Sequence, residues 1–378
     1  MKTTASDFNQ FLSVKYTLDE HNAIELQKEF VDANQFSGSD LPLISILLPV
    51  YNAEAFIETC ILSLLHQTYQ NIQIIIVNDG SKDGTLKLIE NLALSNSKKI
   101  KIINNDGNKG LIFSLNEGLK HCSGKYTARM DADDICMPNR IEKQYLLMES
   151  RSDLSAVCSW MLRFNKDQPL ETVKYSDDFQ VLKSNLFFYC PLPHPAAFFK
   201  TEIIQSLGYR NEYTITEDYD LWRRLFKHHK VSVVQEPLLM YRQHNEQVTQ
   251  KGKNDLIFTQ LQKVAQDLFS DIQLSVSPNE IKNHLNYCMF ENNIPSAKVF
   301  VELDIWFNKL FQHVVASNYI HTESFKKYIY TQRWVGVYME FKNQFTLRER
   351  VLLRKSAFNK LGLKQQVMDT FFYLFNLR

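Results

Sequence analysis

Three aspartates stand within four positions in the segment ARMDADD, at Asp131, Asp133 and Asp134. The residues KYTARM come directly before them and read as a buried strand, so the carboxylates would emerge from a strand end. An Asp-x-Asp pair in that position can bind a hard divalent cation, because Mg²⁺ and Mn²⁺ prefer oxygen ligands and bridge carboxylates to a diphosphate. The alternative is an acidic turn in solvent, since aspartate favours turns in general.

Two other aspartates stand in places where chemistry is expected. Asp79 in VNDGSKDGT follows another apolar run and either accepts hydrogen bonds from a base or ribose or forms a plain turn before a helix. Asp218 in TITEDYDLWRR precedes Leu221 and Trp222 by three and four residues, which predicts that it shares the inward face of a helix. The helix dipole accounts for an acid in the first turn, but an inward carboxylate is also a candidate general base.

The elements that must position these residues alternate between strand and helix from 43 to 131. This order predicts a doubly wound, mostly parallel α/β sheet, which gathers the polar residues just past each strand at one edge. Asn52 is the expected N-cap of the first helix. The predicted strands are LISILLPV, IQIIIVN, KIKIIN and KYTARM, and the predicted helices are AEAFIETCILSLLHQ, GTLKLIENLAL and LIFSLNEGLKHC.

The remaining sequence sets the expected domain division. Residues 1–42 predict an N-terminal helical extension, 43–250 the α/β domain and 251–378 a C-terminal helical region. Within the α/β domain, SAVCSWMLRF, AAFF and VSVV read as further strands, and TEDYDLWRRLFKHH reads as a helix. In the helical region, Ser277 and Glu280 in SPNE form a capping-box pattern that starts a helix.

The composition of the chain indicates which kinds of binding partner and which cell compartment to expect. The chain has 378 residues and a formal net charge of +1, so no global field favours nucleic acid. Six cysteines without a CxxC pair, and the absence of a signal-peptide or membrane-spanning pattern, predict a cytoplasmic protein. The segment 347–378 carries seven Lys/Arg against two acids and ends near FFYLF. It forms either a basic helix on the inner face of the plasma membrane or a helix packed on the protein or on a second copy in a homo-oligomer.

Taken together, PVYNAEAF, VNDGS, NKGLIFSLNEGL, ARMDADD and TEDYDLW resemble the motifs of the family 2 glycosyltransferases in order and spacing, over roughly 43–245. That resemblance implies the GT-A fold. It also implies that Asp218 is the catalytic base and that Asp133 binds the metal, with His244 completing the metal site. The nucleotide-sugar contacts that it implies are Pro49, Tyr51, Asn52, Asp79, Lys109, Arg129, Asp131, His194 and Glu217. Asp134 receives no role.

The reaction that the resemblance implies is an inverting sugar transfer with Mn²⁺ or Mg²⁺. The donor is a nucleoside diphosphate sugar, most often a UDP-sugar, and the acceptor is a hydroxyl of a glycan or lipid-linked saccharide. Bacterial lipopolysaccharide, O-antigen or capsule synthesis is the expected setting. Two alternatives remain at this point: a sugar-nucleotide nucleotidyltransferase, which should carry a glycine-rich phosphate loop after the first strand, and a non-catalytic sugar-binding protein on the same fold.

Overall fold

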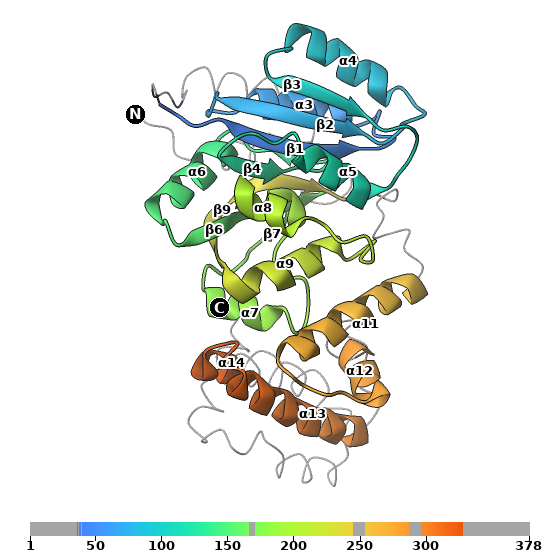
Figure 1. The fold of residues 1–378 in the computed structure, drawn as a ribbon, viewed down its shortest axis with the longest axis vertical. Coiled ribbons are helices and arrows are strands. Elements are labelled where there is room, and N and C mark those ends of the chain that lie inside the picture. Colours follow the sequence, from blue (N-terminus) through green and yellow to red (C-terminus); the bar gives the residue numbers. More distant parts are fainter. Residues whose placement is uncertain are drawn as a thin grey trace. The chain divides into compact units, whose positions relative to one another are not determined.

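The computed structural model describes residues 36, 38, 40–165, 171–244, 254–286 and 297–327 (Figure 1). The chain divides into two compact units: the first takes in 1–179 and 192–252, and the second takes in 180–191 and 253–378. Almost all of the predicted extension over 1–42, and the whole basic tail over 347–378, lie outside the described residues. No helix among the described residues has both the length and the apolar character needed to cross a bilayer.

The first unit is built on a nine-stranded sheet with the order β3-β2-β1-β4-β8-β6-β9-β5, and β7 pairs with β6. The four strands predicted between 43 and 131 are present and run parallel to one another. Their branched apolar side chains are mostly buried, as expected for strands covered on both faces. These strands are β1 (Ile44–Val50), β2 (Ile72–Asn78), β3 (Ile100–Asn104) and β4 (Tyr126–Arg129).

Helices cover both faces of this parallel part. The chain moves one way along the sheet from β1 to β3 and then returns to β4, so right-handed crossovers put α5 on the face opposite α3 and α4. Figure 1 shows α5 in front of the strands and α3 behind them. The direction reverses between β1 and β4, and open α/β sheets bind ligands at such a switch point. The helices are α3 (Ile57–Leu65), α4 (Thr85–Ser95) and α5 (Leu111–Leu119).

Beyond β4 the sheet is mixed, which the strand–helix alternation did not predict. β8 runs antiparallel to β4 and β6, while β9 runs parallel to β6 and antiparallel to β5. The β5–β9 pairing, with Ile135 opposite Met240, brings the end of β9 to the loop after β4. The elements of this part are β5 (Ile135–Cys136), α6 (Arg140–Ser150), β6 (Leu154–Phe164), β7 (Glu171–Val173), η1 (His194–Ala196), β8 (Phe198–Lys200), α8 (Thr201–Leu207), α9 (Glu217–His228) and β9 (Lys230–Arg242).

The prediction that Asn52 caps the first helix is wrong. The Ala53 carbonyl accepts from the backbone N–H groups of Phe56 and Ile57, so a turn precedes the helix, which begins at Ile57. Asn52 instead adopts a left-handed backbone with φ 46°, and its Oδ1 accepts from the Lys82 N–H at 2.9 Å. The asparagine therefore joins the loop after β1 to the loop after β2.

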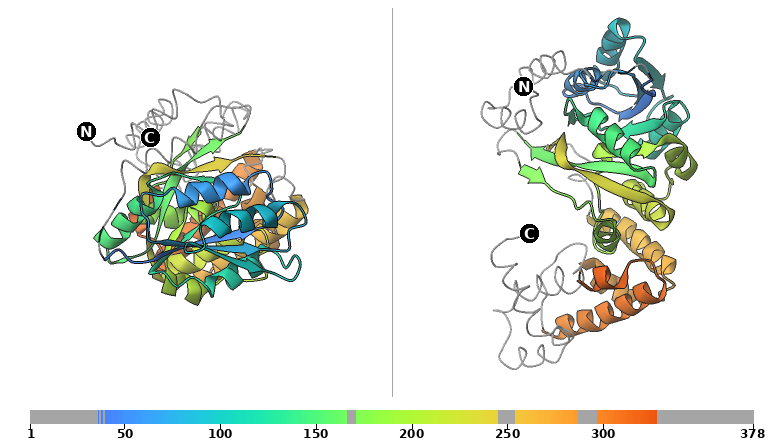
Figure 2. Two further views of the ribbon diagram at one scale, coloured as in Figure 1. Left: turned by 90° about the horizontal axis from the view of Figure 1, so that it is seen from above. Right: turned by 90° about the vertical axis from the view of Figure 1, so that its left-hand side faces the viewer.

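The described part of the second unit is helical, as predicted for the C-terminal region, and its helices over 254–327 appear in orange and red in Figure 2. Ser277 and Glu280 form the predicted capping box. Residues 180–191, which follow the start of α7 (Phe179–Asn185), belong to this unit, and its core includes Phe187 and Phe188. The helices are α11 (Asn254–Asp271), α12 (Pro278–His284), α13 (Ala297–Ala316) and α14 (Thr322–Lys327).

Candidate active site

The loop between β4 and β5 carries the three predicted aspartates, and it starts from a firmly held strand end. The Arg129 N–H donates to the Ala197 carbonyl at 2.9 Å, and the Met130 N–H donates to the Leu47 carbonyl at 3.1 Å. One ligand-type oxygen of each aspartate, Asp131, Asp133 and Asp134, lies within 4.8 Å of the others. The carboxylates therefore converge at the carboxyl edge of the parallel strands.

Asp131 is paired with a buried arginine. Arg129 Nη1 forms an ion pair with Asp131 Oδ2, while Arg129 Nε is buried without a hydrogen-bond partner. Burial raises the pKa of Asp131; Arg129 opposes this effect, and the charges of Asp133 and Asp218 add to it. Arg129 therefore partly neutralises this aspartate.

Asp133 is partly exposed, and it links the loop after β4 to the residues at the end of β9. Its Oδ2 lies 2.9 Å from His244 Nε2, and its carbonyl accepts from Arg242 Nε at 2.7 Å. The His244 ring lies beside the Phe56 ring, with centroids 4.8 Å apart. His244 and Asp133, which are distant in sequence, therefore meet in one place, as the predicted metal site requires.

Asp134 is the most buried of the three carboxylates, with 1% of its surface exposed. Its Oδ1 accepts from the Arg242 N–H at 2.9 Å, but its Oδ2 is buried with no hydrogen-bond partner. Burial, together with repulsion from Asp133 and Asp131, raises the pKa of Asp134 well above its ordinary value. This carboxylate anchors β9 with one oxygen and leaves the other available inside the cluster.

The cluster suits a hard divalent cation. Three carboxylates and an imidazole form an oxygen-rich donor set of the kind that Mg²⁺ and Mn²⁺ prefer. Burial, with repulsion among the carboxylates, raises the pKa of Asp131 and of Asp134, and the unpartnered Asp134 Oδ2 is a free acceptor. A divalent cation would relieve both conditions.

The start of α9 places two more carboxylates beside this cluster. Glu217 is buried, whereas Asp218 is only partly buried, and Asp218 Oδ1 accepts from the Tyr219 N–H at 2.7 Å. Asp218, which the sequence places on the inward face of the helix, is thus less buried than its neighbour Glu217. Burial and the charge of Asp218 raise the pKa of Glu217 to about 8.

His194 lies in η1 and is buried among the groups of this second acidic pair. Its Nε2 is 2.8 Å from the Tyr209 hydroxyl, and its Nδ1 is 3.9 Å from Glu217 Oε1. Burial and the charge of Arg129 lower the pKa of His194 well below its usual range, so the ring is neutral at physiological pH. The structure thus brings His194, Glu217 and Arg129 together.

Unlike the carboxylates of the loop after β4, the Asp79 carboxylate is hydrogen-bonded to several protein donors. Its carboxylate accepts from Asn105 Nδ2 at 2.7 Å, from the Lys109 N–H at 2.9 Å and from the Gly110 N–H at 2.8 Å. Gly80 follows with φ 68°, and a Cβ there would lie 2.5 Å from the Gly107 carbonyl carbon. Asp79 therefore folds the loop after β3, and the Lys109 side chain is left exposed at the same edge.

The loop after β1 completes the edge. Pro49 is buried in β1 opposite Val77 of β2. Tyr51 is 44% exposed, and the Asn52 N–H donates to Ser81 Oγ at 3.0 Å. An exposed aromatic ring beside ordered backbone is suited to stacking on a base, whereas Pro49 is buried within its strand.

Several residues of the site were not found from the sequence. Tyr209 and Asn105 stand in loops without a motif, and Arg140 stands in an ordinary helix start. Arg140 is buried, and its Nη2 donates to the carbonyls of Arg129 at 2.8 Å and Ala197 at 3.2 Å. Asp220, buried under three arginines, did have a signal, because Arg223 and Arg224 follow it at i+3 and i+4.

Comparison with known proteins identifies the class. The family model described as "Glycosyl transferase family 2" matches residues 45–206. An uncharacterized glycosyltransferase of Haemophilus influenzae is 34% identical over 220 residues, which cover 55% of this chain and 68% of the relative. Another, from Methanocaldococcus jannaschii, is 30% identical over 267 residues, which cover 69% of this chain and 86% of the relative.

A solved structure has the same fold. Staphylococcus aureus TarS 1–349, crystallised in complex with UDP-GlcNAc, superposes with a TM-score of 0.52 at 15% sequence identity, covering 73% of this chain and 82% of that one. The chain therefore belongs to glycosyltransferase family 2, and its first unit has the GT-A fold. It is a glycosyltransferase, and the predictions of family, fold and enzyme class are confirmed.

Proposed function

We propose that the protein is an inverting, metal-dependent glycosyltransferase that uses a nucleoside diphosphate sugar as its donor, with UDP as the nucleotide that the family resemblance favours. The observation that carries the proposal is the meeting of two acidic groups at the switch point. The cluster of Asp131, Asp133 and Asp134 suits a cation, and Asp218 lies close enough to affect the pKa of Asp131.

The metal site in this proposal consists of Asp133 as direct ligand, with His244, Asp131 and Asp134 around it. A bound Mn²⁺ or Mg²⁺ would supply positive charge to the diphosphate leaving group. Arg129 balances Asp131, so that the loop carries less uncompensated negative charge toward the phosphates. Tyr51, Asn52, Asp79 and Lys109 then form the nucleotide side, with Tyr51 as the base contact, while Pro49 supports the strand.

Asp218 is the proposed general base. Its carboxylate accepts the proton of an acceptor hydroxyl as that oxygen forms a bond to the anomeric carbon of the donor. The bond between the anomeric carbon and the diphosphate oxygen breaks in the same step, and the nucleoside diphosphate leaves with the electron pair. One displacement inverts the anomeric configuration, and general base catalysis of this kind contributes about 10²–10⁴-fold in rate.

The acceptor class that we propose is a glycan or a lipid-linked saccharide in bacterial surface polysaccharide synthesis, such as lipopolysaccharide, O-antigen or capsule. The proposed location is the cytoplasm, with contact to the inner face of the plasma membrane through residues 347–378. The same segment would otherwise support a homo-oligomer. Both readings of this segment concern residues outside those that the structure describes.

The test incubates the protein with a panel of UDP-sugars, Mn²⁺ and saccharide acceptors. The release of UDP is measured with and without EDTA. We expect transfer with one donor, loss of transfer in EDTA, and a product of inverted configuration. Asp218→Asn should lower kcat by about 10²–10⁴-fold while UDP binding is kept. Asp153→Asn is the matched control, because Asp153 is a surface carboxylate paired with Lys230. Full activity in EDTA would exclude the metal role of Asp133.

A further inference from the structure

The side chain of Tyr209 contacts His194, a residue of the candidate site. Its side chain is buried, and its hydroxyl lies 2.8 Å from Nε2 of His194. His194 is itself 4% exposed and reaches toward Glu217 with its other nitrogen. Neither residue type nor spacing marks Tyr209 in the sequence, and no motif of the family resemblance includes it.

The direction of this hydrogen bond follows from accounting for protons. The His194 Nε2 is the partner that the structure gives the buried Tyr209 hydroxyl, so the hydroxyl proton is satisfied only if Tyr209 donates. The Nε2 atom must then be the unprotonated nitrogen of a neutral ring. The ring proton consequently sits on Nδ1, which is buried without a hydrogen-bond partner and lies 3.9 Å from Glu217 Oε1.

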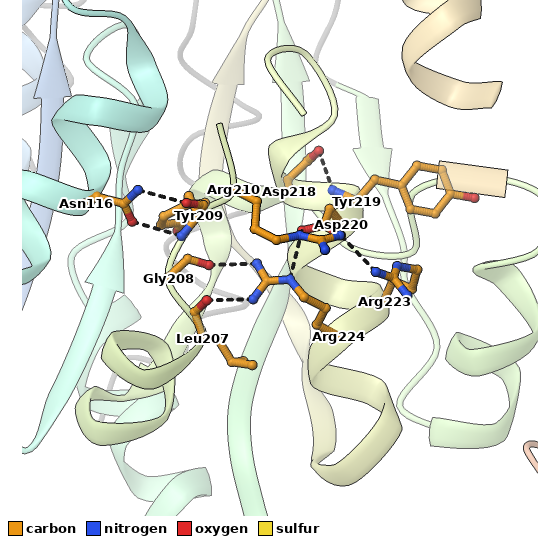
Figure 3. A network of polar contacts seen from close by, with 10 residues as sticks. All are labelled: Asn116, Leu207, Gly208, Tyr209, Arg210, Asp218, Tyr219, Asp220, Arg223 and Arg224. Carbon is orange, nitrogen blue, oxygen red and sulfur yellow. Dashed lines mark hydrogen bonds and ion pairs between the residues drawn. The ribbon is translucent and has the colours of Figure 1, made fainter. Parts of the chain in front are cut away.

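A dense set of contacts fixes Tyr209 in place, as Figure 3 shows. The Asn116 side chain binds both the N–H and the carbonyl of Tyr209 at 2.8 Å. Arg224 Nη1 and Nη2 donate to the carbonyls of Leu207 and Gly208 at 2.7 Å. The buried Asp220 in turn holds Arg224, with Nε at 2.8 Å. The turn before Tyr209 is thus tied to both α5 and α9.

This turn also depends on its glycine. Gly208 has φ 53°, in the left-handed region, and a Cβ there would lie 3.4 Å from Asn116 Oδ1. Asp220 also accepts from Arg210 Nε at 2.9 Å and pairs with Arg223 at 3.3 Å. Buried polar atoms with this many partners favour one arrangement over others. The position of the Tyr209 hydroxyl is therefore set by the fold and not by an adjustable loop.

We propose that Tyr209 is a positioning residue that holds His194 in the Nδ1–H tautomer and so aims a hydrogen-bond donor at the space beside Glu217. The ligand chemistry that fits this donor is a hydroxyl of the donor sugar, which accepts from Nδ1–H and donates to Glu217. The donor sugar is favoured because Arg129, beside His194, pairs with Asp131 in the loop assigned to the diphosphate. This last step rests on the proposed function, whereas the tautomer does not.

The tautomer is measured first, on the wild-type protein, from the two-bond ¹H–¹⁵N correlations of its histidine rings. The His194 signals are those that disappear in His194→Gln. We expect the pattern of an Nδ1–H ring, and we expect Tyr209→Phe to convert it to a mixture or to the Nε2–H form. An Nε2–H ring in the wild-type protein, or an unchanged Nδ1–H ring in Tyr209→Phe, would overturn the proposal.

The role toward the sugar is measured by binding. Tyr209→Phe should weaken the binding of the accepted UDP-sugar about 3- to 10-fold, the loss of one hydrogen bond, and leave UDP binding unchanged because UDP lacks the transferred sugar. Tyr126→Phe is the control, since its buried hydroxyl bonds to Glu149 away from the site. Equal weakening of UDP and UDP-sugar would overturn the sugar role. If no UDP-sugar binds to the wild-type protein, the proposed function fails while the tautomer result still stands.

Discussion

Two acidic loops at the same edge of the sheet differ in how completely hydrogen-bond donors satisfy their buried carboxylates. Asp79, after β2, accepts three hydrogen bonds and organises the loop after β3. Asp134, after β4, accepts one hydrogen bond and leaves an oxygen without a partner beside two further carboxylates. Burial alone therefore does not mark a carboxylate that suits a cation. The informative feature for a cation site is negative charge that the protein's own donors leave unsatisfied.

The sharpest way to break this comparison is Asp133→Asn. A metal ion contributes several kcal/mol of charge stabilisation, so we expect transfer to fall by at least about 100-fold. We expect Mn²⁺ to raise the Tm of the wild-type protein by binding the folded state, and we expect this rise to disappear in the variant. Wild-type rates together with a retained Mn²⁺ shift would mean that the acidic loop is only a turn.

His244→Gln tests the arm of the cluster supplied by β9. His244 contacts Asp133 at 2.9 Å, and loss of a partner that orients a metal ligand weakens metal affinity by about 10–100-fold. The measurement is a Mn²⁺ titration followed by the rate of transfer at saturating Mn²⁺. We expect high Mn²⁺ to restore much of the rate. An unchanged Mn²⁺ affinity would remove His244 from the site.

Asp79→Asn is the matched change in the satisfied loop. An amide nitrogen placed against backbone N–H donors leaves buried groups unpaired, so we expect a loss of about 1–3 kcal/mol in the free energy of unfolding. Urea denaturation measures this loss. The Mn²⁺-dependent rise in Tm should remain, because Asp79 is not part of the acidic cluster. Loss of that rise with stability unchanged would reverse the assignments of the two loops.

Glu217→Gln gives the smallest effect and depends on pH. Burial raises the pKa of Glu217 to about 8, whereas its ordinary value is near 4.5, so the folded state binds this proton more tightly than the unfolded state. The stabilising contribution is complete below about pH 4.5 and is lost as the pH rises toward 8. The variant should therefore match the wild-type Tm near pH 4.5. Near pH 8 its Tm should exceed the wild-type Tm by roughly 2–4 °C for each kcal/mol of unfolding free energy that the wild-type protein has lost through Glu217. Parallel Tm curves without metal would show that Glu217 titrates normally.

The parallel half of the fold could be predicted because its strands are long apolar runs and its crossovers follow one hand. The positions of Asp131, Asp133 and Asp218 followed from that topology and from the family motifs. The mixed half could not be predicted, since β5 and β7 are only two and three residues long and are set by tertiary pairing. The division into domains at 42 and 250 remains a prediction.

The supporting contacts of the site were also beyond the sequence. Asn105 and Tyr209 act through a side chain on a distant backbone or ring, and such pairs carry no local period. Asp134 looked like a turn residue, and only its burial and unpartnered oxygen distinguish it. The assignment of Asn52 failed because a turn competed with the helix for the same residues. Local patterns thus located the candidate acidic groups and missed the residues that hold them in place.

One feature of the second unit limits how the protein can be divided by engineering or recombination. Phe187 and Phe188, from the segment 180–191, pack against Phe325 of α14 and Phe307 of α13. A chain cut at 252 would keep these two rings and lose the helices that cover them. Exchange of the C-terminal helices between relatives therefore requires residues 180–191 to be exchanged as well. The segment that can be exchanged as a folded unit is discontinuous in the sequence.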